Sequence, residues 1–278
     1  MALTLWMAVI ASVAAMACAP VGCYLVLRRL SLLGDAISHA VLPGLVLAFL
    51  LTGKVGGWPA VLGALAVGAL TSWLMEWVHR GTGVPEDAGL GVVFTTLFAL
   101  GVLLLGLVDN ADLDPGCVLF GVLEPAPLDT LVVPLLGCEM PRSLFTLVPL
   151  LLLNGVLFVV FWKEIQQTAF DPQHAAAAGL PTALVHHGIL TLTAGIIVAA
   201  FEAVGAVLVV AMLIVPAVTA QRLTRRLHHM MLVAVTLAGL AGLLGTALAV
   251  YLDTSVAGCM SVVAGLQLAV VLLGQCGR

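Results

Sequence analysis

Long uninterrupted apolar runs constrain this chain more than any other feature. A helix needs about 20 apolar residues to cross the hydrocarbon core of a bilayer. Nine runs of about this length follow one another, and they cover residues 4–27, 33–52, 58–79, 88–108, 144–162, 183–201, 203–220, 230–251 and 255–275. Because lipid cannot satisfy an exposed backbone, we expect an all-α polytopic membrane protein.

The composition supports the same conclusion. Hydrophobic residues make up 62% of the 278 residues, and Asp, Glu, Lys and Arg together only 9%, whereas a soluble domain carries roughly 25% charged residues. A soluble core of this size cannot enclose so much apolar surface, so most of it faces lipid. We expect one transmembrane domain over residues 1–278, lipid as its surroundings and no nucleic-acid partner.

The basic residues predict how the chain is oriented. The first run lacks a basic leader, and Arg28 and Arg29 follow it where a cleavage site would stand, so we expect a transmembrane helix there and no signal peptide. With the N-terminus outside, nine spans place eight of the ten Lys and Arg residues and the C-terminus in the cytoplasm, and only Lys54 and Arg142 outside. This is the positive-inside distribution.

The weakest point of this count is the long apolar stretch 183–220. We expect two helices that separate at a turn near Glu202, because three arginines lie at 222–226. A single tilted or broken helix would leave eight spans and invert the C-terminal topology. Glu202 is then a solvated acid at an outer turn.

Residues 109–143 form an acidic segment that this topology places outside. It holds six acidic residues and five prolines against the single Arg142. The simpler interpretation is a solvated loop with short interfacial helices; the alternative is a segment that concentrates cations or docks a delivery protein. Cys117 and Cys138 allow a disulfide here, although free thiols acting as small buried hydrophobes are the simpler reading.

Asp35 and His39 are the polar pair that most needs an explanation. They are four residues apart, so they share one face of a helix, and their oxygen and nitrogen donors suit Mn(II), Fe(II) or Zn(II). Pro43 follows one turn later and should bend the helix beside them. Three structural alternatives are a helix cap by Asp35, a local ion pair, and hydrogen bonds to a neighbouring helix.

Two donors are fewer than the four that a dehydrated divalent ion needs. A second copy of the chain across a two-fold axis would complete the set. The adjacent pairs His186–His187 and His228–His229 point to different helix faces, so we interpret them as interfacial histidines.

The polar stretch "EIQQTAFDPQHAAAAGLP" (164–181) lies in a predicted cytoplasmic loop. Asp171 is a good N-cap with Pro172 at the first helical position, and Gly179 and Pro181 end the helix. Such a helix fits either an interfacial connector or a handle for a cytoplasmic partner. The sequence has no GxxxxGK[ST], HExxH or GxSxG pattern, so we expect no ATP binding through a P-loop and no hydrolytic enzyme.

Three segments resemble the permease subunits of ABC importers for zinc, manganese and iron. They are "RRLSLLGDAISHAVLPGLVLAFLLTG" (28–53), "FDPQHAAAAGL" (170–180) and "AVGAVLVVAMLIVPAVTAQRL" (203–223). The resemblance implies a type II-like permease of eight or nine helices that works as a homodimer in a bacterial cell membrane. It also implies that Asp35 and His39 coordinate the transported metal.

The same resemblance implies the partners. A separate subunit would bind and hydrolyse ATP and would contact a coupling helix at about 168–181 through Phe170, Asp171, Pro172, His174 and Gly179. An extracytoplasmic metal-binding protein would deliver the ion. Glu202 stands where relatives would carry a basic or neutral residue, which affects only the delivery contact.

We therefore expect an importer of Zn²⁺ or Mn²⁺, with Fe²⁺ third, that is itself no enzyme and holds no permanent cofactor. A permease for a metal chelate or vitamin is the first rival, and it needs a wide pore without ligands. A proton-coupled secondary transporter is the second, and it would act without an ATPase.

Overall fold

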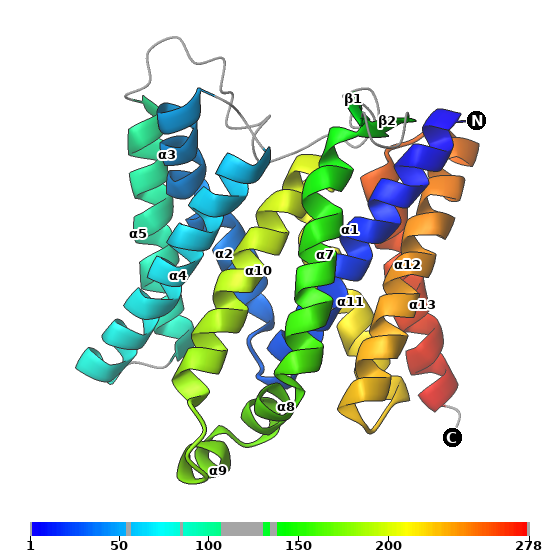
Figure 1. The fold of residues 1–278 in the computed structure, drawn as a ribbon. Helices are drawn as coiled ribbons and strands as arrows, with labels where there is room; N and C mark the ends of the chain where they lie inside the picture. Colours follow the sequence, from blue (N-terminus) through cyan, green and yellow to red (C-terminus); the bar gives the residue numbers. More distant parts are fainter. Residues whose placement is uncertain (1, 54–56, 84–85, 107–129, 134–137, 277–278) are drawn as a thin grey trace.

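The computed structural model describes residues 2–53, 57–83, 86–106, 130–133 and 138–276. It is a bundle of long helices whose chain ends lie at opposite ends of the bundle (Figure 1). The helices are α1 (Ala2–Leu27), α2 (Ser31–Ala40), α3 (Leu42–Thr52), α4 (Gly57–Thr82), α5 (Glu86–Gly106), α7 (Arg142–Val160), α8 (Trp162–Phe170), α9 (Pro172–Ala177), α10 (Thr182–Val204), α11 (Ala206–Leu223), α12 (Leu227–Leu252) and α13 (Val256–Cys276). The predicted all-helical membrane fold is confirmed.

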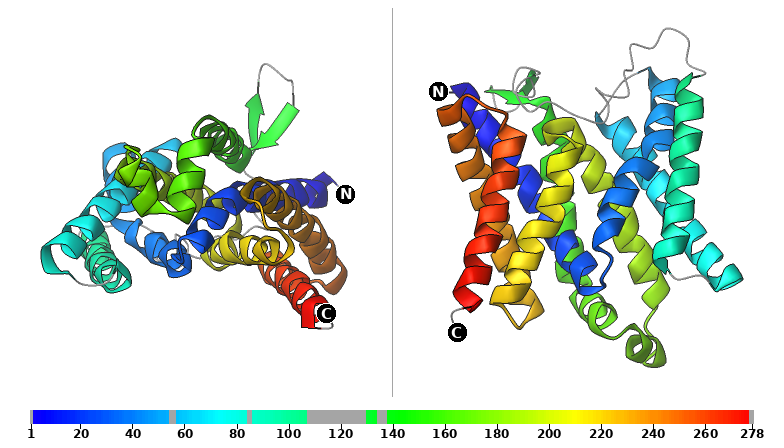
Figure 2. Two further views of the ribbon diagram at one scale, coloured as in Figure 1. Left: turned by 90° about the horizontal axis from the view of Figure 1, so that it is seen from below. Right: turned by 180° about the vertical axis from the view of Figure 1, so that it is seen from behind.

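The described residues contain eight segments long and apolar enough to cross a membrane, and a shorter apolar helix at Leu208–Leu223. That shorter helix belongs to α11, which runs back through the bundle from the end where α10 stops (Figures 1 and 2). The stretch 183–220 therefore forms two separate helices, as predicted.

The turn between these two helices lies at Gly205, three residues beyond the predicted turn at Glu202. Gly205 has φ 84° and ψ 156°, a backbone conformation that is open to glycine and strained for other residues. Glu202 lies in the last turn of α10. An apolar stretch has no polar residue to indicate a turn in the sequence, so only the glycine indicates where the turn lies.

The second apolar run forms two helices that meet at Val41. α2 ends at Ala40, and α3 begins at Leu42 with Pro43 in its first turn. Proline has no N–H to donate, and its ring clashes with the carbonyl four residues earlier, which is that of His39. The chain therefore changes helix immediately beside one member of the polar pair.

α1 packs against α7, α10, α11 and α12. Tyr24 and Leu25 on it are fully buried. The buried amide of Asn154 in α7 donates from Nδ2 to the carbonyl oxygen of Ala17, at 2.8 Å. Close packing and such interhelical hydrogen bonds replace the hydrophobic driving force that is absent between helices in lipid.

The backbones of α3 and α4 touch at two glycines, and we expect Gly44→Ala and Gly63→Ala each to destabilise the protein. A Cβ on Gly44 would lie 2.4 Å from the carbonyl oxygen of Gly63, and a Cβ on Gly63 would lie 2.3 Å from that of Gly44. Backbone atoms cannot yield as a flexible side chain does, so each variant should lose about 1–3 kcal/mol. The thermal unfolding midpoint in detergent measures this loss.

Gly155→Ala is the matched control, because Gly155 lies inside α7 with open space around its Cβ position. Alanine is the better helix former there. Equal destabilisation by Gly155→Ala would contradict a specific α3–α4 contact.

The described part of the acidic segment forms two short antiparallel strands, β1 (Thr130–Val133) and β2 (Cys138–Pro141), which the sequence analysis did not predict. The β-branched residues of β1 favour an extended strand. The hairpin lies at the same end as the N-terminus (Figures 1 and 2). Residues 109–129, with Cys117, lie outside the described residues, so the predicted alternatives for this loop and its cysteines stay predictions.

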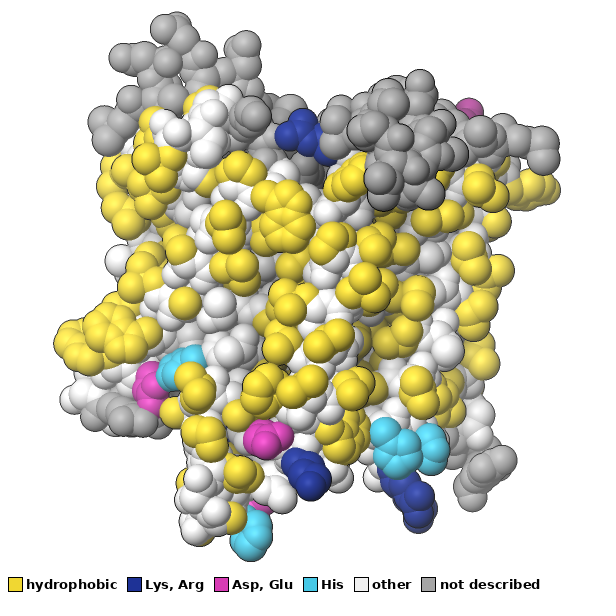
Figure 3. All heavy atoms as spheres, in the orientation of Figure 1, with side chains coloured by type: hydrophobic (Ala, Val, Ile, Leu, Met, Phe, Trp, Pro, Cys, Tyr) yellow, Lys and Arg dark blue, Asp and Glu magenta, His cyan; other side chains and the backbone are white. Residues whose placement is uncertain are grey.

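The two ends of the bundle differ in charge. On the face shown in Figure 3, hydrophobic side chains cover the middle of the molecule, and most of the described charged and histidine side chains lie toward the lower end. The segments that carry Arg28, Lys163 and Arg222 meet at this end, beside the C-terminus, whereas Arg142 begins α7 at the other end. The fold thus brings basic residues that are far apart in sequence to one side.

Candidate functional site

The Asp35–His39 pair lies on α2, one helical turn apart. The distance from His39 Nε2 to Asp35 Oδ1 is 3.8 Å, and the side chains are 40% and 61% exposed, respectively. The N-terminus of α2 has no side-chain cap, and its N-cap position is Leu30, so Asp35 is not a capping residue. Among the described residues neither side chain hydrogen-bonds to a neighbouring helix. Both donors are open to a ligand.

Their separation suits a shared metal ion. Nitrogen and oxygen donors at about 2.1 Å from a tetrahedral ion lie about 3.4 Å from each other. A small side-chain rotation closes the observed 3.8 Å to this value. No third His, Cys, Asp or Glu joins the pair within the described part of the chain, so one chain supplies two ligands at this position.

Neighbouring groups pack against His39 and the helix segment that carries the pair. The ring of Phe98 on α5 meets the His39 ring edge-on, with centroids 5.7 Å apart and an interplanar angle of 78°. Ser38 donates its hydroxyl to the carbonyl oxygen of Asp35 at 2.5 Å. α5 also approaches the helix change closely, because a Cβ on Gly101 would lie 2.8 Å from the Pro43 nitrogen. The segment that carries the pair is therefore packed against α5.

The predicted helix after Asp171 is present as α9. The Asp171 carboxylate accepts a hydrogen bond from the backbone N–H of His174 at 2.9 Å, Pro172 is the first helical residue, and Gly179 has φ 83°. Ala175 is buried. The N-cap and the glycine that ends this turn are as the sequence predicted.

α8 and α9 extend beyond the other helices at the end of the bundle where the C-terminus lies (Figures 1 and 2). A shallow groove of about 350 Å³ lies along them and is lined by Lys163, Gln166, Gln167, Phe170, Asp171 and His174. Phe170 is exposed beside these polar side chains. An exposed aromatic ring among polar groups is typical of a protein interface.

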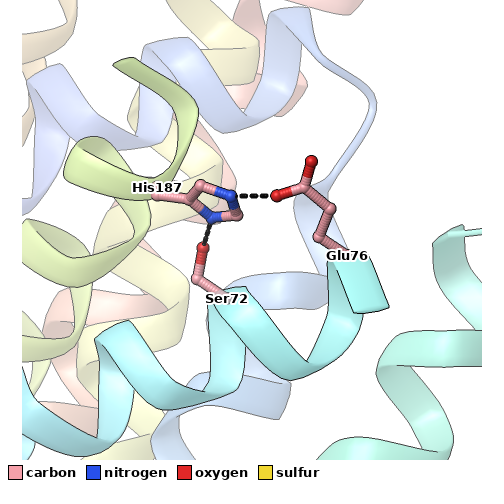
Figure 4. A network of polar contacts seen from close by, with 3 residues as sticks. All are labelled: Ser72, Glu76 and His187. Atoms are coloured by element: carbon pink, nitrogen blue, oxygen red, sulfur yellow. Dashed lines mark hydrogen bonds and ion pairs between the residues drawn. The ribbon is translucent and has the colours of Figure 1, made fainter. Parts of the chain in front are cut away.

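The start of α10 holds a polar network that sequence reasoning missed. His187 contacts the Ser72 hydroxyl through Nδ1 and the Glu76 carboxylate through Nε2, and both partners belong to α4 (Figure 4). His186 points elsewhere, and its Nδ1 lies 3.3 Å from the hydroxyl of Tyr24 on α1. The histidines face different neighbours, as predicted, but they bind other helices and are not merely interfacial. An acidic residue at position 76 inside an apolar run was the available signal.

Sequence comparison places the chain among known membrane permeases. The chain is 42% identical to the manganese transport system membrane protein MntD of Bacillus subtilis, over 94% of this chain and 88% of that protein. It is 38% identical to the zinc transport system membrane protein TroD of Treponema pallidum, over 98% of this chain and 74% of that protein. Other similar proteins bear the names of chelated iron transport systems.

The fold agrees with this comparison. The structure of PsaBC from Streptococcus pneumoniae in complex with a Fab superimposes with a TM-score of 0.79 at 27% identity, covering 98% of this chain and 91% of that one. The model of the ABC 3 transport family matches residues 1–275, which confirms the predicted resemblance. The chain therefore belongs to the ABC 3 transport family.

Proposed function

We propose that this chain is the transmembrane subunit of an ATP-driven importer of a divalent transition metal ion. The observation that carries the proposal is the Asp35–His39 pair, exposed on one face of α2 just before an otherwise apolar membrane segment is interrupted at Val41. A charged side chain in a membrane segment costs about 2.5 kcal/mol or more. Such a pair, which makes no hydrogen bond to another helix in the described part of the chain, is best explained by a ligand that neutralises it.

Two copies of the chain would complete the coordination. Asp35 and His39 of one copy and the same residues of a second copy supply four donors, which is the number a divalent ion needs after it loses its water. The 61% exposure of the Asp35 side chain leaves room for a second copy to approach. The homodimer is part of our proposal.

ATP binding and hydrolysis would take place on a separate subunit. This chain has no P-loop sequence, and α8 and α9 project from the bundle as a docking element with the Phe170 ring exposed. The residues proposed to contact the ATPase are Phe170, Asp171, Pro172, His174 and Gly179. A metal-binding protein outside the cell would deliver the ion at the opposite end.

The charge distribution supports an orientation in a bacterial cell membrane. The end that carries Arg28, Lys163 and Arg222 would face the cytoplasm, in agreement with the positive-inside rule. The N-terminus is then outside and the C-terminus inside, because the chain ends lie at opposite ends of the bundle. On this orientation α9 reaches into the cytoplasm, where ATP is available.

Zinc and manganese are the proposed substrates, and iron is third. An oxygen and nitrogen donor set suits all three ions, and similar proteins are named for manganese, zinc and chelated iron transport. The transported ion is cargo, so its site should bind weakly enough to release it.

Elemental analysis of whole cells tests the function. The chain is produced with its ATPase and delivery protein in a host stripped of its own importers, and zinc, manganese and iron are supplied together. We expect selective, ATPase-dependent accumulation of one ion. A control with a catalytically inactive ATPase should accumulate none.

Two results would contradict the proposal. Accumulation that persists with the inactive ATPase would indicate a secondary transporter. Uptake of a metal chelate or vitamin by an assembled complex that takes up no free ion would indicate the chelate permease instead.

A further inference from the structure

We propose that His186 and His187 are positioning residues that brace the start of α10 against α1 and α4, so that movement of α9 reaches the helices beside the metal pair. This inference rests on the proposed function, since it assigns a route between ATPase docking and the Asp35–His39 pair. We call His186 and His187 with Tyr24, Ser72 and Glu76 the histidine brace, a name that here means this set of interhelical hydrogen bonds and not a copper-binding motif.

The first arm of the histidine brace joins α10 to α4. An ionised carboxylate only accepts hydrogen bonds, so His187 donates from Nε2 to Glu76, and its Nδ1 meets the Ser72 hydroxyl (Figure 4). Ser72 is buried, and the side chains of His187 and Glu76 are 25% and 26% exposed, respectively. Both ring nitrogens are used, which fixes the imidazole in one orientation and ties two positions on α4 to one on α10.

The second arm joins α10 to α1. The Tyr24 hydroxyl lies 3.3 Å from Nδ1 of His186, and Tyr24 is fully buried. Tyr24 lies in the last turn of α1, and only Arg28–Leu30 separate α1 from α2. Asp35 is on that next helix. A displacement of α10 at His186 therefore acts on the segment that leads directly into the metal pair.

The joint between α9 and α10 is short and hydrogen-bonded. Only residues 178–181 separate the two helices. The N–H of Leu180 donates to the carbonyl oxygen of Ala175 at 3.0 Å, and the N–H of Thr182 donates to that of Leu180 at 2.8 Å. Such a joint transmits a push on α9 to the first turns of α10, where the histidine brace begins.

α4 offers a second route to the same place. Its backbone touches that of α3 where Gly63 meets Gly44, and Gly44 lies in the first turn of α3, just beyond the helix change at Val41. The metal pair lies immediately before that change. Both arms of the histidine brace thus lead to α2, one through the end of α1 and one through α4 and α3.

Hydrogen bonds suit this role better than apolar contacts do. Apolar helix surfaces in lipid are held together by close packing alone, because lipid is as apolar as they are. A hydrogen bond adds a defined donor–acceptor geometry, and breaking one in a partly buried place is costly because little water is available to replace the lost partner. The histidine brace therefore makes α1, α4 and the start of α10 move together.

The test compares His187→Ala with the matched control His228→Ala in the complete complex reconstituted into vesicles. His228 likewise belongs to a pair of adjacent histidines near a helix start, but it is exposed, and its ring contacts are Trp162 and His229. The readouts are ATP hydrolysed, Mn²⁺ or Zn²⁺ transported, and the same ion bound to the permease at equilibrium. We expect His187→Ala to lower transport per ATP by about tenfold, as the loss of two partly buried hydrogen bonds to one ring would, with hydrolysis and metal binding retained.

Milder variants keep the test decisive if His187→Ala fails to assemble. Glu76→Gln retains an oxygen that accepts from Nε2, and Glu76→Ala does not, so the first should restore most of the transport per ATP that the second loses. Tyr24→Phe removes only the hydroxyl of the other arm and should lower the same ratio.

Three results separate the possible failures. Wild-type transport per ATP in both Glu76→Ala and Tyr24→Phe would overturn the histidine brace. Loss of equilibrium metal binding in Glu76→Ala would also overturn it, because Glu76 and His187 would then act as a second metal site. Absence of transport by the wild-type complex would instead contradict the proposed function.

Discussion

Replacement of either Asp35 or His39 by alanine is expected to abolish metal uptake in a complex that still assembles. The two donors of each copy lie 3.8 Å from each other, just before the interruption between α2 and α3. Among the described residues, no third His, Cys, Asp or Glu joins them. In a pair of copies, one substitution removes two of four ligands. Uptake of the selected ion, measured by elemental analysis, should fall to the level of cells without the permease.

The same variants should leave the fold intact, which distinguishes a ligand from a structural residue. Asp35 and His39 are 61% and 40% exposed, and neither hydrogen-bonds to another helix among the described residues. Alanine is also the strongest helix former. We expect an unchanged thermal midpoint and unchanged co-purification with the ATPase.

His229→Ala is the matched control for these variants, because it removes an exposed histidine near the start of α12. It should transport normally. Normal uptake by both Asp35→Ala and His39→Ala would show that the pair is not a metal site. The pair would then be interpreted as a local ion pair.

Disruption of α9 is expected to have the second largest effect, because it separates ATP hydrolysis from transport. Proline at position 176 would remove a backbone donor from a helix of six residues, and its ring would clash with the carbonyl of Pro172. The cost of about 3 kcal/mol exceeds what so short a helix can absorb. Ala176→Pro should therefore lose metal-stimulated ATP hydrolysis, co-purification with the ATPase, or both.

Two substitutions at Asp171 separate the cap from the charge. The carboxylate caps α9 by accepting from the N–H of His174, and asparagine caps a helix about as well as aspartate does. Asp171→Asn should remain coupled, whereas Asp171→Lys loses the cap and reverses the charge. Stimulated hydrolysis at the wild-type level in both Ala176→Pro and Asp171→Lys would refute the coupling role of α9.

The two polar sites differ in how far the sequence revealed them. Asp35 and His39 are four residues apart, so helical geometry alone places them on one face. Glu76 and His187 are 111 residues apart and meet only because α4 packs along α10. No local pattern pairs them. The adjacent histidines at 186 and 187 indicated two different faces, but which helices lie against those faces follows from the packing of the whole bundle.

The turns and helix ends also divide into those that the local sequence predicted and those that depend on tertiary packing. Asp171, Pro172 and Gly179 predicted both ends of α9 because each residue acts on its own backbone. The turn near Glu202 was placed three residues too early, because an apolar run allows a turn at any glycine and tertiary packing selects Gly205. The strands β1 and β2 were missed because strand pairing depends on a partner across a loop.

The sequence by itself determined that this chain is a bundle of membrane helices and which end carries the basic residues, and it singled out the two side chains on one helix face that we propose as metal ligands. Lipid imposes these features, because it requires long apolar helices and makes every polar residue within them conspicuous. Only the tertiary structure decided that Gly44 touches Gly63, that Phe98 supports His39, and that His187 meets Glu76. These contacts join residues far apart in the chain, and one lipid-compatible helix can pack against another in many ways until close-fitting glycines and buried hydrogen bonds select one arrangement.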